Sequence, residues 1–321
     1  MPTWPRLLTW PTAALLACSA HAAGPSLAQR AAAAEATAGS QGNACQPIRP
    51  FYWEVGDPSG AQASGSVDEP GNGEHVTAET VMNIASASKW LYGAYVVQRR
   101  AGAPTEEDIR HLNFQAGYSD FSWCLRRQTV GECQAYRRND VVLPQAEGKF
   151  DYSGGHMQHH AVLMGLGELD NAGLARELRS QLGRDIHLSY SQPQPAGGVV
   201  TSAADYARFL RKLITGELAL GQQLGQHAVC TNRLRCPGQA LGTPIPLKEA
   251  WHYGLGYWIE DDPKLGDGSF SSAGAFGFYP WVDAAVQRYG VIARKGAMGS
   301  GYDSMLCGRL IREAWASGAA R

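Results

Sequence analysis

The pattern of apolar and polar positions divides the chain into a short strand, a long helical stretch, a group of strands and a final helix. Phe51–Val55 is an aromatic and aliphatic run that ends at a Gly-Asp-Pro-Ser-Gly turn, which is typical of a β-strand. Over 84–99, apolar residues recur at helical spacing and no proline interrupts them. Residues 102–150 are mixed in character and predict short helices and loops.

Three more helices are expected in the middle of the chain. One begins just after Tyr152 and runs to about Leu166, and a second covers 170–182. The third begins at Ser202, which has the side chain of a good N-cap, and Asp205 lies in its first turn, where a negative charge is favourable.

The last part of the chain reads as strands followed by one helix. Runs at 254–259, 276–282 and 289–293 predict three successive strands, and a helix follows over about 305–316, with Gly318 at its stop. The order of strand, helices, strands and helix favours an α+β fold, in which an antiparallel sheet is flanked by terminal helices and carries an inserted helical subdomain. The expected domain covers residues 45–321, with its α/β part at 45–85 and 250–321 and its mainly helical part at 86–249.

The first 22 residues have the pattern of an export signal. Arg6 precedes an apolar run over 7–17 that is too short for a permanent membrane span. Ala20-His21-Ala22 fits cleavage by an ordinary signal peptidase, which gives a signal peptide over 1–22. Leu15-Leu16-Ala17-Cys18 is an alternative, because it resembles a bacterial lipobox and would leave a lipidated Cys18 as the mature N-terminus. Both alternatives remain open.

Export implies a periplasmic or secreted protein, or an outer-membrane-tethered lipoprotein if Cys18 is lipidated. Membrane contact is expected only in that last case. Residues 23–44 are rich in Ala, Gly, Ser and Gln, and we interpret them as a flexible linker without a fold.

The composition excludes several classes of protein. The chain has 321 residues, of which 44% are hydrophobic and 18% charged, so wholesale disorder is excluded. The formal net charge is −1 and basic residues do not cluster along the sequence, so nothing indicates binding to nucleic acid. The sequence contains no phosphate-binding loop and no dinucleotide-binding fingerprint, and no cofactor is expected.

Six cysteines remain once Cys18 is cleaved off or lipidated, and an even number in an oxidising compartment predicts disulfides. Six cysteines permit 15 pairings. Proximity in the sequence favours Cys124–Cys133 and Cys230–Cys236, which leaves Cys45–Cys307. A zinc site is disfavoured because no Cys-x-x-Cys pair is present.

The candidate chemistry begins at Ser86-Ala87-Ser88-Lys89. Residues three apart on a helix share a face, so the Ser86 hydroxyl and the Lys89 amine are within reach of one another. A partly desolvated lysine can take the proton of a serine and make it a nucleophile. By itself the tetrapeptide is common, and an N-cap serine beside a surface lysine is the usual explanation.

Two further segments change that judgement by their order and spacing. Asp151-Tyr152-Ser153-Gly154 opens the next expected helix and places a phenol where a second proton-handling group is needed. Ser272-Ala273-Gly274-Ala275 lies directly before the strand at 276–282. Each alone is explained equally well as a core tyrosine or as a turn of small residues.

Together these segments resemble the serine hydrolases of the penicillin-binding protein and class C β-lactamase group, which includes many esterases and amidases. Ser86-x-x-Lys89 matches the nucleophile motif, and Tyr152-Ser153-Gly154 is similar to the Tyr-x-Asn motif. Residues 195–209 and 253–258 resemble the family's Gly-Gly helix and the strand that follows it. Ser272-Ala273-Gly274 takes the place of the Lys-Thr-Gly or His-Thr-Gly motif. The resemblance covers nearly all the chain beyond residue 50.

The resemblance implies a β-lactamase/transpeptidase-like fold and an acyl-enzyme mechanism. Ser86 would attack an ester or amide carbonyl of a small-molecule or peptide-like substrate, with Lys89 and Tyr152 as proton-transfer groups. The backbone N–H groups of Ser86 and Ala275 would form the oxyanion hole.

Two departures from the family pattern concern the substrate. Gly154 replaces an asparagine, and Ser272 replaces the lysine or histidine of the third motif, which leaves Gly154, Ser272, Ala273 and Gly274 as the expected substrate-binding positions. Loss of that cation makes efficient β-lactam hydrolysis doubtful and favours a neutral ester or amide. Arg294 and Lys295, after the last strand, are a possible source of charge, although a solvated strand end is the simpler interpretation.

Two alternatives remain beside the hydrolase. The chain could be a catalytically degenerate ligand-binding protein on the same scaffold, or a penicillin-binding DD-peptidase. His156, His159 and His160 recur at helical spacing, but no carboxylate lies within that run. We therefore expect no metal site, and expect His156 to line the cleft.

Overall fold

The computed structural model describes residues 1–2 and 24–321. Residues 3–22 of the predicted signal peptide, with the lipidation site at Cys18, lie outside the described residues. Among the described residues, none of the helices is both long enough and apolar enough to span a membrane.

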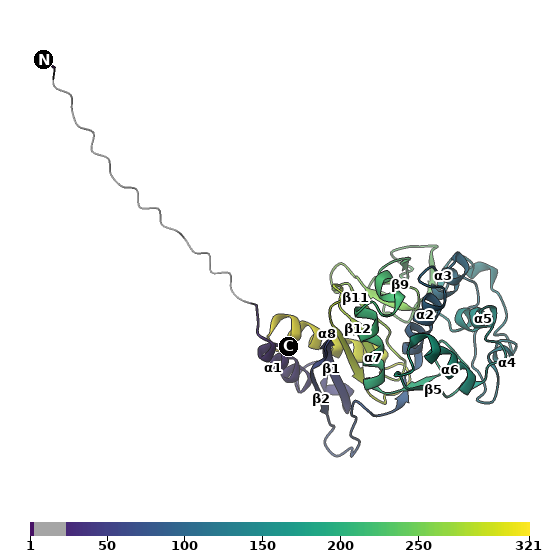
Figure 1. Ribbon diagram of the computed structural model, residues 1–321, viewed down its shortest axis with the longest axis horizontal. Coiled ribbons are helices and arrows are strands. Elements are labelled where there is room, and N and C mark those ends of the chain that lie inside the picture. Colours follow the sequence, from purple (N-terminus) through teal and green to yellow (C-terminus); the bar gives the residue numbers. More distant parts are fainter. Residues whose placement is uncertain (3–23) are drawn as a thin grey trace.

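The centre of the molecule is an antiparallel sheet of eight strands (Figure 1). Its order is β2-β1-β13-β12-β11-β10-β9-β7, so β1 lies between β2 at the edge and the last strand, β13. The strands are β1 (Phe51–Asp57), β2 (Gly60–Val67), β7 (Val229–Cys230), β9 (His252–Gly254), β10 (Tyr257–Glu260), β11 (Ser269–Ser271), β12 (Tyr279–Val282) and β13 (Tyr289–Ala293).

Alternate residues of β13 contact helices on opposite faces of the sheet. Ile292 lies beside Gly308 of helix α8 (Gly301–Ser317), whereas the Tyr289 hydroxyl accepts a hydrogen bond of 2.9 Å from Arg211 of helix α7 (Ala203–Ile214). Because successive side chains of a strand point to opposite faces, α8 and α7 cover the two faces of the sheet. This explains why all five residues of β13 are buried.

The inserted subdomain is mainly helical, as predicted, and lies beyond one edge of the central sheet (Figure 1). Its helices are α2 (Ser88–Arg99), α3 (Glu106–Leu112), α4 (Val130–Gln134), α5 (Gly155–Leu163) and α6 (Asn171–Leu182). It also holds two small sheets, β3-β6-β5 and β4-β8, formed by β3 (Met82–Asn83), β4 (Phe150–Asp151), β5 (Leu188–Tyr190), β6 (Val199–Thr201) and β8 (Ala240–Gly242).

Helix α2 joins the subdomain to the central sheet. Ten of its twelve residues are buried, from Ser88 to Val97. A Cβ at Gly93 would stand 2.0 Å from the carbonyl oxygen of Leu255, in the turn between β9 and β10. Only glycine permits this approach, and it fixes the middle of α2 against the sheet.

Several sequence predictions are confirmed in detail. The strand at 289–293 has the predicted bounds, and Ser202 caps α7 by accepting a hydrogen bond from the Asp205 N–H. Gly318 follows α8 with φ of 70°, the left-handed conformation that commonly ends a helix.

Other predicted boundaries are wrong. The run at 254–259 is divided by the turn at 255–256 into two strands, and the strand predicted at 276–282 begins only at Tyr279. The strand β11 was not predicted. The apolar runs are longer than the strands because their ends are buried turns, and burial alone does not distinguish a turn from a strand.

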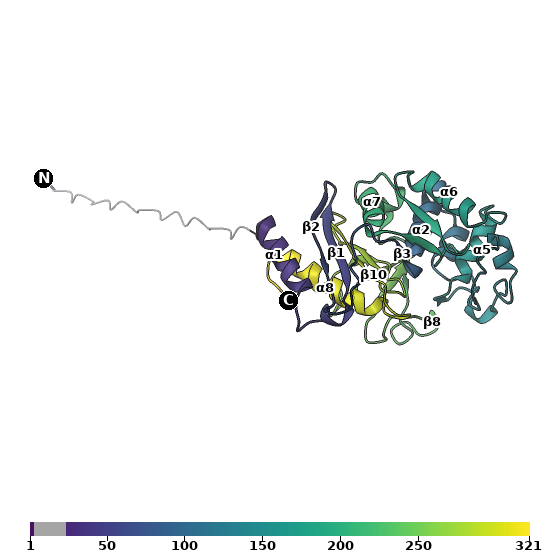
Figure 2. The same cartoon turned by 90° about the horizontal axis from the view of Figure 1, so that it is seen from below.

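The interpretation of 23–44 as a linker without a fold is also wrong for part of that segment. Helix α1 (Leu27–Ala38) forms there and lies beside α8 near the C-terminus (Figure 2). Ser26 caps it in a reciprocal capping box with Gln29, and Ala34 and Ala38 are fully buried. Alanine has the highest helix propensity, so a composition that suits a linker also suits a helix once a neighbour buries one face.

All three predicted disulfides are confirmed. Cys124–Cys133 and Cys230–Cys236 close short loops in the subdomain and beside it. Cys45–Cys307 has a Cα–Cα distance of 4.6 Å and joins the segment before β1 to α8. It therefore fastens the two ends of the domain to one another.

Removal of the Cys45–Cys307 disulfide is expected to destabilise the protein more than removal of Cys230–Cys236. The first closes a loop with a separation of 262 residues and the second one of 6, and the entropy that a crosslink removes from the unfolded chain grows with loop length. We expect the Cys45→Ala/Cys307→Ala variant to lose about 2–5 kcal/mol of unfolding free energy in urea titrations. Equal losses in the two double variants would contradict this expectation.

Candidate active site

Ser86 and Lys89 meet at the start of α2, as their spacing predicts. Ser86 is the middle residue of a short 3-10 helix (Ala85–Ala87) that leads into α2, and its side chain is half-buried. The Lys89 Nζ donates hydrogen bonds to Ser86 Oγ at 2.9 Å and to the carbonyl oxygen of Ala196 at 2.8 Å. The lysine is thus held in place from two sides.

The surroundings of Lys89 favour its neutral form. The residue is only 4% exposed, and among the described residues no carboxylate forms an ion pair with it. Burial lowers the pKa of the Lys89 amine from 10.5 to about 7. A large fraction of this amine is therefore unprotonated near neutral pH and can accept a proton from the Ser86 hydroxyl.

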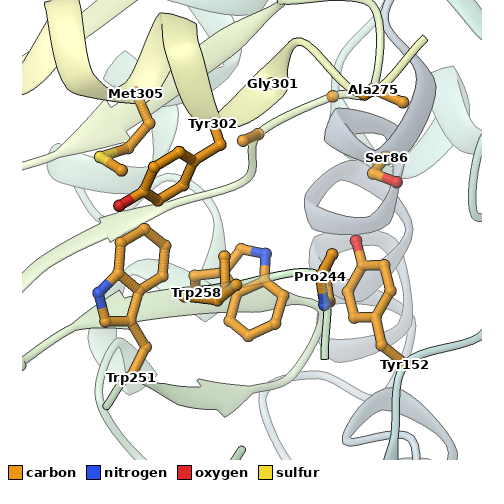
Figure 3. A pocket seen from close by; sticks show the side chains of 13 residues that line it. Ser86, Tyr152, Pro244, Trp251, Trp258, Ala275, Gly301, Tyr302 and Met305 are labelled. Carbon is orange, nitrogen blue, oxygen red and sulfur yellow. The ribbon is translucent and has the colours of Figure 1, made fainter. Parts of the chain in front are cut away.

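Tyr152 lies close to both Ser86 and Lys89. Its hydroxyl points toward Ser86 (Figure 3), and the Lys89 Nζ lies 4.9 Å from the centre of its ring. Burial raises the pKa of the Tyr152 phenol to about 12, although its interactions with Ser86 and Trp258 partly oppose the rise. The phenol is accordingly protonated at neutral pH, where it can donate a proton and Lys89 can accept one.

The segment 272–275 packs directly against the nucleophile. The Ser272 hydroxyl donates a 3.1 Å hydrogen bond to the carbonyl oxygen of Ser86, so this buried side chain holds the backbone of the serine. A Cβ at Gly274 would stand 2.1 Å from the carbonyl oxygen of Ile84, which makes glycine necessary for this approach. Because the two segments approach each other so closely here, Ala275 lines the same pocket as Ser86.

The predicted oxyanion hole needs two free N–H groups beside Ser86. The Ser86 N–H belongs to the first turn of a helix, where N–H groups have no partner within the helix. Among the described residues, no backbone carbonyl accepts a hydrogen bond from the Ala275 N–H, which lies in a turn. Both groups thus remain candidates for stabilising an oxyanion.

A pocket opens directly beside Ser86 and Tyr152. It has a volume of about 190 Å³ and lies between the start of α8, the 272–275 segment and the loop before β9. Its walls are Ser86, Tyr152, Pro244, Ile245, Trp251, Trp258, Ala273, Gly274, Ala275, Gly299, Gly301, Tyr302 and Met305. The predicted nucleophile, phenol and oxyanion residue therefore share one cavity.

Several solved structures are similar to this chain at low sequence identity. A β-lactamase of Bacteroides dorei, described as putative, matches with a TM-score of 0.58 and 17% identity, over 83% of this chain and 94% of its own. A penicillin-binding protein homologue of Pyrococcus abyssi gives a TM-score of 0.59 at 12% identity, over 85% of this chain and 74% of its own. The D-amino acid amidase of Ochrobactrum anthropi gives 0.57 at 12% identity, over 83% and 95%.

The chain has the β-lactamase/transpeptidase-like fold. The fold predicted from the motifs is thereby confirmed. Neither a protein-family profile nor a curated protein sequence matches the chain.

Within this β-lactamase-like fold, Gly154 does not line the pocket. A Cβ there would stand 3.1 Å from the side-chain nitrogen of Gln194 and 3.4 Å from the ring of Phe121. The amide of Gln194 thus occupies the space beside a glycine where the family motif has an asparagine. No feature of the sequence near residue 194 indicated this role.

The two residues considered as alternative sources of positive charge are engaged elsewhere. Arg294 is 9% exposed, so it is not the solvated strand end expected from the sequence, and it donates to Ser304 Oγ at 3.0 Å and to the Ile48 carbonyl at 3.2 Å. Lys295 forms an ion pair of 3.4 Å with Glu74. Neither lines the pocket.

The histidines on α5 take structural positions. His156 is buried and accepts a hydrogen bond from the Ala116 N–H, and it does not line the pocket, so that expectation is wrong. His160 contacts the Asp108 carboxylate at 2.8 Å and the Tyr92 hydroxyl at 3.0 Å. His159 stacks on the ring of Tyr118.

Proposed function

We propose that the protein is a serine hydrolase that cleaves an ester or amide through an acyl-enzyme on Ser86. The observation that carries the proposal is the 2.9 Å hydrogen bond between Ser86 Oγ and a buried lysine amine whose pKa is lowered to about 7. A serine hydroxyl becomes a nucleophile when an adjacent base takes its proton, and Lys89 has the position and the pKa of such a base.

The reaction then follows from the two side chains. Lys89 takes the proton of Ser86 as Oγ attacks the carbonyl carbon, and the N–H groups of Ser86 and Ala275 stabilise the negative oxygen. The protonated phenol of Tyr152 gives its proton to the leaving alcohol or amine, and regains one from Lys89. Water then attacks the acyl-enzyme, and the proton transfers run in the reverse direction, from water through Tyr152 and Lys89 to Ser86 Oγ. This step releases the acid and restores Ser86.

We propose that the part of the substrate that lies next to Ser272-Ala273-Gly274 is uncharged. Ser272 supplies no positive charge there, and its hydroxyl is occupied by the Ser86 carbonyl. Arg294 and Lys295 do not compensate. This supports an esterase or amidase over a β-lactamase or a DD-peptidase, whose substrates carry a carboxylate.

We also infer that the protein acts outside the cytoplasm. Three disulfides support this inference, because such bonds persist mainly in oxidising compartments. The signal peptide over 1–22, its lipidated alternative at Cys18 and a periplasmic or secreted location remain parts of the proposal.

A fluorophosphonate probe tests the proposed nucleophile. We expect native protein to gain the mass of one probe molecule less HF, because fluoride leaves and the serine proton is lost as the O–P bond forms. Peptide mapping should place the adduct on Ser86 and not on Ser88, two residues later. Protein denatured before labelling is the control and should gain none. Folded protein that gains no adduct would instead support the ligand-binding alternative.

A further inference from the structure

Beyond Tyr152, the pocket beside Ser86 has an aromatic and aliphatic wall that the proposed chemistry does not use. Rings follow one another away from the nucleophile: Tyr152 stacks on Trp258 with ring centres 5.2 Å apart, and Trp258 meets Trp251 edge-on at 5.9 Å. Figure 3 shows Tyr302 and Met305 of α8 facing this row from the other side. The far part of the cavity therefore lies between apolar surfaces.

The polar atoms of Trp251 and Tyr302 are bound away from the cavity. Glu249 is 2% exposed, and its carboxylate accepts hydrogen bonds from the Trp251 indole N–H at 2.9 Å and from the Tyr302 hydroxyl. Arg309 donates to the same carboxylate at 2.9 Å and balances its charge. Trp251 and Tyr302 thus present mainly ring carbon to the cavity, and their orientation is fixed.

No charged side chain is among the pocket-lining residues in the part of the chain that the structure describes. A carboxylate or ammonium group entering the far end would lose its hydration without gaining an ion pair, which disfavours charged groups strongly. The volume of about 190 Å³ exceeds the roughly 150 Å³ of an apolar cavity that binds benzene. One six-membered ring attached to the scissile group fits this space.

We propose that this pocket binds an uncharged, apolar group of about the size of one aromatic ring, carried by the ester or amide that Ser86 cleaves. This inference rests on the proposed function and adds the substrate class to it. The ring can belong either to the acyl group or to the alcohol or amine, and the experiment distinguishes the two.

Four esters differing only in the group presented test the proposal: ethyl acetate, ethyl phenylacetate, benzyl acetate and monoethyl succinate, each followed by acid release at constant pH. We expect kcat/KM of one ring ester to exceed that of ethyl acetate by at least about tenfold, the lower limit for an added apolar group in a fitting pocket. The succinate ester should be no better than ethyl acetate. Preference for phenylacetate places the ring on the acyl side, and preference for benzyl acetate places it on the alcohol side.

A matched pair of variants tests whether this pocket is the cause of the preference for the ring ester. Ile245→Asp puts a carboxylate on the pocket wall and should reduce the ratio of ring ester to ethyl acetate at least tenfold. Leu234→Asp makes the same kind of change at an exposed position outside the pocket and should leave the ratio unchanged. Labelling of Ser86 by a fluorophosphonate in both variants shows that their folds and nucleophiles are intact.

The failures of the two proposals are distinguishable. If Ser86 is labelled and ethyl acetate is hydrolysed but neither ring ester is preferred, the pocket proposal is overturned and the hydrolase proposal stands. If Ser86 is not labelled, binding of phenylacetamide is measured by ligand-observed NMR against acetamide. Binding that Ile245→Asp abolishes and Leu234→Asp retains supports the pocket, and absence of binding overturns it.

Discussion

Replacement of Ser86 by alanine is expected to lower kcat/KM for any ester that the protein hydrolyses by at least about 10⁴-fold, as removal of a serine nucleophile does in other hydrolases. The substitution deletes only the Oγ atom, which accepts one hydrogen bond from Lys89. Because Ser86 is half-buried and its hydroxyl caps no helix, the unfolding free energy should change little. Ester hydrolysis by the purified variant, with its thermal midpoint measured in parallel, checks both expectations.

Ser88 provides the matched control. It lies in the same tetrapeptide and is fully buried, where its hydroxyl accepts a 3.2 Å hydrogen bond from the Val199 N–H. Ser88→Ala should therefore reduce stability by about 1 kcal/mol, the usual value of one hydrogen bond, and leave most of the activity in place. Loss of activity in Ser88→Ala with retention in Ser86→Ala would refute the assignment of the nucleophile.

Replacement of Lys89 by methionine is expected to lower kcat/KM by about 10²–10⁴-fold, the usual contribution of a general base. The side chains are similar in length, and methionine suits the buried position, so the fold should be retained. The wild-type rate should rise with pH through about 7, because the neutral amine is the active form and its fraction increases as the proton is lost. That limb of the pH profile should be absent from the variant.

Stability gives an independent readout of the same substitution. The unfolded chain binds the lysine proton up to pH 10.5 and the folded chain only up to about pH 7, so wild-type stability should rise with pH across that interval. Methionine has no such dependence on pH, although it loses the hydrogen bonds to Ser86 and Ala196 at every pH. The stability of Lys89→Met relative to the wild type should therefore fall as pH rises from about 7 to 10.5. A stability difference that stays constant over this interval would contradict the buried, neutral lysine.

The sequence was sufficient to predict the fold where side-chain type and spacing act locally. Ser202 and Asp205 mark the start of α7 because a helix needs these polar groups at its first turn. Ser86 and Lys89 face one another because three residues on a helix bring them together. Proximity in the sequence predicted two of the disulfides, and the third is the pair of cysteines that remained.

Other parts of the site depend on contacts between distant segments and have no local signal. Trp251 and Tyr302 are far apart in the sequence, and each alone looks like a core aromatic residue. Only the fold brings both to the Glu249 carboxylate and makes them the walls of a cavity. The Gln194 amide beside Gly154 is a similar case. Gln194 belongs to a loop and Gly154 to the start of a helix, and the two segments are distant in the sequence.

The hydrogen bond from Lys89 to the Ala196 carbonyl has a consequence for how this site tolerates mutation. A main-chain oxygen is present whatever side chain stands at residue 196, so genetic drift there cannot delete the anchor of the lysine. The position of this carbonyl depends instead on the conformation of the backbone around it. That conformation requires glycine at 198, because a Cβ there would stand 2.2 Å from the carbonyl oxygen of Gln192. Homologues that use this anchor should therefore retain glycine at 198, and a small side chain at residue 196, which is fully buried.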